Sequence, residues 1–168
     1  MALLTAASLI VFIIEAQIPV PVPVPGAKLG LSNAVTLFAL FCDYGKSRSE
    51  DNLTAANVFL ILICRIILGA VFTGRVIAFI HSLAGGLLAF AVMVVLKNFV
   101  TNRQIWVCSA VGAVFHNIGQ IITAVLITGT PEIAAYLPVL VIAGIVSGTV
   151  TGWVAQLTVN RLAQRGSG

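Results

Sequence analysis

Eight polar or ionisable side chains lie inside, or at the edge of, segments that are otherwise apolar. Imidazole, carboxamide and carboxylate groups exchange hydrogen bonds with small molecules, and cationic groups attract anions. Such groups are costly to bury, so each needs a protein partner or a cavity that holds a ligand. We therefore predict a small-molecule binding site built from Glu15, Lys28, Asn33, Arg65, His81, His116, Asn117 and Gln120.

His116 and Gln120 have a spacing that brings them together. They are four residues apart, so on a helix they share a face, and Asn117 lies within the same turn. Gly112 lies one turn earlier on this face, and we expect it to leave room for a ligand or for a neighbouring backbone. His116 can also be a structural histidine bonded to a backbone carbonyl, and the sequence leaves both interpretations open.

Glu15 is the one acidic residue inside the predicted helices. It either contacts a ligand directly or forms an ion pair with Arg65 or Lys28 that neutralises both partners in a low dielectric. The sequence leaves both interpretations open.

Motifs that carry catalysis are missing from the sequence. It has no paired-carboxylate metal motif, no phosphate-binding glycine loop with its lysine, no Gly-x-Ser-x-Gly and no His-Glu-x-x-His. Two histidines on different helices could share a metal, but further ligands are not evident. We therefore expect no catalytic residue, no metal site and no cofactor, and predict that the chain is not an enzyme.

The composition places these polar groups in a membrane. The chain has 168 residues, of which 60% are hydrophobic and 8% charged, whereas a soluble domain is roughly half apolar and a quarter charged. Charge-free stretches run from Val76 to Leu96, from Gln104 to Pro131 and from Ile133 to Asn160. Each exceeds or reaches the ~20 residues that a bilayer-spanning helix needs.

We predict an all-α integral membrane protein that forms a single transmembrane domain over residues 1–168. The expected helices cover residues 2–18, 28–42, 53–72, 76–96, 104–128 and 136–160. The segment 28–42 is barely long enough, so it is a short or tilted helix or a re-entrant one. The count of transmembrane helices is therefore six, or five if this segment does not cross.

The basic residues indicate an orientation and exclude nucleic acid as a partner. Nine of them are spread along the chain and form no patch of groove size. With a cytoplasmic N-terminus and six spans, the C-terminus is also cytoplasmic, and only Lys28 and Arg75 fall outside. The residues that fall inside are Lys46, Arg48, Lys97, Arg103, Arg161 and Arg165. The bias satisfies the positive-inside rule.

In this orientation the polar groups lie in the outer half of the membrane or at its midplane, and the inner half is apolar. This asymmetry predicts a cavity open to the outside, since a channel would carry polar lining to the inner face as well. We expect helices one, four, five and six to line it. The alternating prolines between Pro19 and Pro25 favour a stiff extended loop that caps it.

Two faces of small residues are suited to close helix packing. Gly144, Gly148 and Gly152 recur every four residues on the last helix, which favours internal packing or, alternatively, contact with a partner subunit. Ala2 and Ala6 form a weaker face of this kind on the first helix.

Several blocks of sequence resemble one bacterial membrane family. They are Ile18-Pro19, Pro25-Gly-Ala-Lys28-Leu-Gly-Leu-Ser-Asn33, His81-Ser-Leu-Ala-Gly-Gly86 and His116-Asn-Ile-Gly-Gln120. Members of this family are described as Gx transporters or as heptaprenyl diphosphate synthase component I. They are grouped with the substrate-binding S components of energy-coupling-factor vitamin transporters.

The resemblance implies an S-component-like bundle of six helices in the bacterial cytoplasmic membrane. Such a subunit binds a small molecule from outside, and a membrane coupling subunit with two ATPase subunits drives its delivery inward. In S components an alanine face on the first helix docks to the coupling subunit, and Ala2-Leu-Leu-Thr-Ala6 resembles it loosely. The alternative is a membrane accessory subunit of isoprenoid or quinone synthesis.

Overall fold

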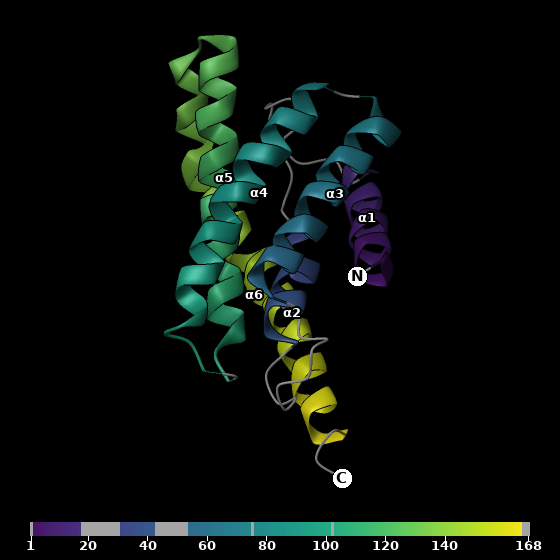
Figure 1. Cartoon of the computed structure of the whole chain (residues 1–168). Helices are drawn as coiled ribbons and strands as arrows, with labels where there is room; N and C mark the ends of the chain where they lie inside the picture. The colour runs from purple at the N-terminus through teal and green to yellow at the C-terminus, as the bar shows by residue number, and fades with distance from the viewer. Residues whose placement is uncertain (1, 18–30, 43–53, 75, 102, 166–168) are drawn as a thin grey trace.

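The computed structural model describes residues 2–17, 31–42, 54–74, 76–101 and 103–165. These residues form helices and turns without any strand, which confirms the predicted all-α class. The helices are α1 (Ala2–Gln17), α2 (Asn33–Phe41), α3 (Ala55–Thr73), α4 (Val76–Lys97), α5 (Ile105–Thr128), the 3₁₀ helix η1 (Pro131–Tyr136) and α6 (Leu137–Arg165) (Figure 1).

Four helical stretches among the described residues are long and apolar enough to cross a membrane. They are α3, α4, α5 and the continuous stretch Pro131–Leu162 formed by η1 and α6. The chain is therefore a multi-pass membrane protein by the length and composition of its helices. The apolar helix α1 has 16 residues and α2 has 9, so both are short of a full crossing at 1.5 Å per residue. The count of six spans stays a prediction.

The helix boundaries differ from the predicted ones mainly at α2 and α6. Leu31 and Ser32 form a turn, and α2 begins only at Asn33. Residues 18–30, which include the proline segment and the predicted start of this helix at residue 28, lie outside the described residues. At the other end of the chain, α6 continues through Arg165, beyond the predicted end at residue 160.

Two glycines end helices through a left-handed backbone conformation. Gly74 has a φ of 63° and its N–H donates to the carbonyl of Ala70, and Gly129 has a φ of 65° and donates to Val125. This conformation favours glycine because it has no Cβ to clash. Pro131 follows shortly and opens η1, a helix that the sequence analysis did not predict.

Five helices are arranged as an open ring, and the short helix α2 contacts each of them. Neighbouring contacts run from α1 to α3, α4, α5 and α6, whereas α2 contacts all five of these helices (Figure 1). Among the described residues, α1 and α6 do not touch each other, so the ring is open between them. The short helix α2 fills this gap, which leaves one of its faces inside the bundle and the other toward the surroundings.

The polar and apolar parts of the interior are separated along the bundle. One hydrophobic cluster occupies one end of the bundle, where α2 and α4 end and α3 and α5 begin. Its fully buried members include Leu40, Phe41, Val58, Met93 and Ile105. Glu15 at the end of α1 and His81 near the start of α4 lie toward the other end, whereas Arg65 and His116 lie near the middle of α3 and α5.

The three glycines of α6 all lie against α5. A Cβ at Gly148 would lie 2.8 Å from the Cα of Ala110 and 2.9 Å from the carbonyl oxygen of Ser109. Gly144 and Gly152 are equally close to α5, so the two backbones are in contact along this face. By contrast, Ala2 and Ala6 on α1 are exposed.

Candidate binding site

Seven of the eight predicted binding residues lie in the described part of the chain, and none of the seven is more than 6% exposed. They are Glu15, Asn33, Arg65, His81, His116, Asn117 and Gln120. Lys28 falls outside the described residues. The structure sorts the seven into two clusters and one residue that stands apart from both.

The first group, here called the Arg65 cluster, consists of Glu15, Asn33 and Arg65. Arg65 donates from Nη2 to the Oδ1 of Asn33 over 3.2 Å. Glu15 lies in the last turn of α1, and its two carboxylate oxygens accept the backbone N–H groups of Leu31 at 3.1 Å and Ser32 at 3.2 Å. These bonds fasten the end of α1 to the start of α2, where the helix dipole favours a negative charge.

The guanidinium of Arg65 is buried with only part of its hydrogen-bonding capacity in use. It is 1% exposed, and its charge interacts with that of Glu15. Its Nε and Nη1 atoms have no hydrogen-bond partner among the described residues, and the same holds for the Nδ2 of Asn33. A buried donor without an acceptor carries its full desolvation cost, about 1–3 kcal/mol, and more when it is charged.

The second group, here called the histidine cluster, consists of His81, His116 and Gln120. The Nδ1 of His81 lies 3.2 Å from the backbone carbonyl oxygen of Gln120. Since a carbonyl only accepts, Nδ1 carries the proton, and this bond ties α4 to α5. The Nε2 of Gln120 lies 3.0 Å from the Nε2 of His116, so the amide donates to the ring along the same face of α5. A bond to a backbone carbonyl, which the sequence analysis considered for His116, is made by His81.

Glycines of α4 lie beside both clusters. A Cβ at Gly85 would lie 2.8 Å from the Nδ1 of His116, and one at Gly86 would lie 3.8 Å from the Nη2 of Arg65. Gly119 on α5 approaches the backbone of Gly85 equally closely. The sequence analysis did not single out these glycines as site residues, although their spacing from His81 and His116 was the available signal.

The model of one protein family describes most of the chain. It is heptaprenyl diphosphate synthase component I, and it matches residues 4–158, a span that contains both clusters. The chain belongs to this family. No curated protein and no solved structure matches the chain.

Asn117, which was predicted to bind ligand together with His116 and Gln120, lies apart from both clusters. Its Nδ2 donates to the backbone carbonyl of Leu140 over 2.6 Å, and Gly144 lies directly beside it. Asn117 therefore joins α5 to α6 and belongs to neither cluster. The room expected beside Gly112 is also filled, because a Cβ there would lie 2.9 Å from the Cγ of Met93. The space expected beside Gly112 is therefore occupied by Met93, whereas a ligand contact of Asn117 stays a prediction.

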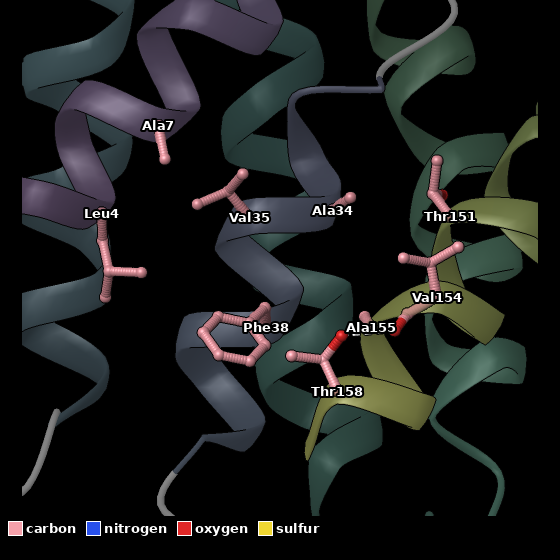
Figure 2. A pocket seen from close by; sticks show the side chains of 9 residues that line it. All are labelled: Leu4, Ala7, Ala34, Val35, Phe38, Thr151, Val154, Ala155 and Thr158. Carbon is pink, nitrogen blue, oxygen red and sulfur yellow. Dashed lines mark hydrogen bonds between the residues drawn. The ribbon is translucent and has the colours of Figure 1, made fainter. Parts of the chain in front are cut away.

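An apolar groove of about 280 Å³ lies where the ring of helices is open, in a place that the sequence analysis did not predict. In Figure 2, side chains of α2 lie between those of α1 and those of α6. The groove is lined by Leu4, Ala7, Ala34, Val35, Phe38, Thr151, Val154, Ala155 and Thr158. Its threonine hydroxyls donate to carbonyls of their own helix, at 2.8 Å for Thr151 and 2.9 Å for Thr158. The groove therefore presents mainly hydrocarbon.

Histidine, cysteine and acidic side chains do not gather into a group of three or more that could hold a metal ion within the described ranges.

Proposed function

We propose that this protein is the substrate-binding membrane subunit, or S component, of an energy-coupling-factor importer for a small molecule such as a vitamin or a related precursor. The observation that best supports this proposal is the pair of buried polar clusters, contributed by α1 to α5, inside a bundle of apolar helices. Polar groups at membrane depth are retained chiefly where they serve a function, and a binding site gives these groups one. In this proposal the chain binds and does not catalyse.

The proposal includes partners and an orientation. A membrane coupling subunit and two ATPase subunits supply the energy, and the chain lies in the bacterial cytoplasmic membrane with both termini in the cytoplasm. Ala2 and Ala6 are suited to dock the coupling subunit, since they are exposed and small enough for a second helix to approach closely.

Co-purification from the native bacterium tests these partners. We expect the tagged full chain to recover a membrane coupling subunit and two ATPases. Ala6→Leu should lower their recovery roughly tenfold, because the larger side chain separates the docking helices. Val146→Leu is the matched control on an exposed face of α6 and should leave recovery unchanged. Recovery without any ATPase would contradict the importer.

Ligand recognition by the histidine cluster is tested by removing its polar groups at nearly constant volume. We expect Gln120→Leu and His116→Phe to reduce binding of the co-purifying small molecule by roughly five- to 150-fold, which corresponds to one lost buried hydrogen bond. The melting temperature of the ligand-free protein should fall only by the modest cost of losing the bond between Gln120 and His116. Quantitative mass spectrometry of the released molecule and thermal melting of the same detergent samples measure the two effects.

His81→Phe is the matched comparison for these variants. It removes the bond from α4 to the carbonyl of Gln120, so it should lower thermal stability. If Gln120→Leu and His116→Phe also lost stability while the affinity stayed the same, the histidine cluster would be a structural tie and not a recognition site.

A second function has its own supporting observation. The family description and the apolar groove favour a membrane accessory subunit of heptaprenyl diphosphate synthesis, with the groove holding an isoprenoid chain. Such a subunit would not itself condense diphosphates, since that chemistry uses aspartate-rich motifs with magnesium, and Asp43 and Asp51 are isolated in the sequence. Both aspartates lie outside the described residues. Recovery of a soluble prenyltransferase in place of ATPases would favour this function.

A further inference from the structure

The Arg65 cluster contains three buried donor atoms that lack an acceptor among the described residues. They are the Nε and Nη1 of Arg65 and the Nδ2 of Asn33, in side chains that are 1% and 6% exposed. The bond from Arg65 to Asn33 holds the two groups side by side, so the three donors belong to one place in the fold. An acceptor brought there by a ligand would remove the desolvation cost of all three.

The charges in this cluster leave room for a further anion. Both carboxylate oxygens of Glu15 accept backbone N–H groups at the start of α2, so the carboxylate is held by the helix N-terminus. Among the residues that the structure describes, the guanidinium makes one hydrogen bond, to a neutral amide. One carboxylate therefore faces both a full positive charge and the partial positive charge of a helix end, which favours a second negative group.

Gly86 of α4 lies beside Arg65, and the other side chains nearest to a Cβ at this position are those of Leu62 and Ile66 of α3. Apolar neighbours lower the local dielectric and strengthen a charge-assisted hydrogen bond to any anion that enters.

We infer that Arg65 and Asn33 bind an anionic group, a carboxylate or a phosphate, of the small molecule that the protein carries. This inference rests on the proposed function and narrows its substrate class to anions. The histidine cluster, on the other side of the glycine pair of α4, then contacts the uncharged part of the same molecule.

Thermal melting of the full chain in neutral detergent tests the anion site. The probes are inorganic phosphate, pyrophosphate and butyrate, each compared with chloride at constant ionic strength. We expect the melting temperature to rise with the concentration of at least one probe, because a ligand that binds only the folded state stabilises it. Arg65→Gln should weaken the apparent affinity by roughly 10- to 150-fold, the effect of losing a hydrogen bond to a charged group.

Asn33→Asp keeps the test decisive if Arg65→Gln does not fold. Its carboxylate accepts from Arg65 in place of a ligand, so the protein should fold and melt at least as high as the parent while its response to the probes is lost. Arg103→Gln is the matched control, since Arg103 is exposed and its loss changes the net charge equally. This control should respond to the probes as the parent does.

A parallel series in micelles containing phosphatidylglycerol or phosphatidylcholine identifies the source of the anion. A response confined to phosphatidylglycerol would assign the site to a lipid headgroup and overturn the small-molecule assignment. No response to any anion, or equal responses in the parent and in Asn33→Asp, would overturn the site itself. Recovery of a neutral small molecule together with the ATPases would overturn only this inference and leave the importer standing.

Discussion

Gly148→Leu is expected to separate α5 from α6 and to lower the free energy of unfolding by at least about 3 kcal/mol. The atoms that a side chain at this position meets belong mainly to the backbone of α5. The nearest are the Cα of Ala110 at 2.8 Å and the carbonyl oxygen of Ser109 at 2.9 Å from the position of a Cβ. Backbone atoms of a packed helix cannot rotate away, so the whole helix has to move.

A pair of alanine variants isolates this effect from a general effect of glycine replacement. Gly148→Ala should already destabilise the protein, whereas Gly86→Ala should be well tolerated. The atoms nearest to a Cβ at Gly86 are the side-chain ends of Ile66 at 3.2 Å and Leu62 at 3.4 Å, which can shift, and the Nη2 of Arg65 at an ordinary contact distance of 3.8 Å. Unfolding by a denaturing detergent, followed by circular dichroism, measures both. Equal stability of Gly148→Leu and the parent would contradict the packing of α6 on α5.

The positions of the long helices could be predicted because they depend on the local amino-acid sequence. Apolar stretches, interrupted by one charge at Arg65, define where α3, α4 and α5 lie, and the structure agrees to within about two residues at their ends. Gly74 and Gly129 directly follow the ends of α3 and α5. The start of α2 was wrong because nothing in the local sequence separates the turn at Leu31 and Ser32 from the helix that begins at Asn33.

The sequence indicated which polar residues are buried, but not which groups they bond to. Polar residues in apolar helices were obvious candidates, and those in the described residues are all buried. Helices that are apolar on every side carry no amphipathic stripe that would fix their rotation. The bond from Asn117 to Leu140, and the packing of Met93 on Gly112, depend on that rotation and on the register between helices.

The apolar groove left no trace in the sequence for a related reason. Its lining residues are of the same kinds as those that face lipid elsewhere, and the short length of α2 is what leaves the ring open between α1 and α6. A groove made by a missing helix contact cannot be read from composition.

Glu15→Gln is expected to destabilise the ligand-free protein by about 3–5 kcal/mol, the cost of leaving a buried charge without its counter-charge. Two losses add up here. A glutamine offers one oxygen where the carboxylate offers two, so one of the backbone N–H groups of Leu31 and Ser32 loses its acceptor. In addition, the guanidinium of Arg65 loses the opposing charge. Glu132→Gln, at an exposed position of η1, is the matched control and should have little effect.

The double variant Glu15→Gln with Arg65→Met separates the two losses. Replacing Arg65 by an apolar side chain removes the uncompensated charge, so the double variant should recover most of the stability that Glu15→Gln loses. It should not recover all of it, because the N–H left without an acceptor at the start of α2 remains buried. Unfolding free energies of the parent, both single variants and the double variant give the coupling between the two charges directly. Losses that simply add would mean that Glu15 and Arg65 act independently, and that the carboxylate serves only to hold α1 against α2.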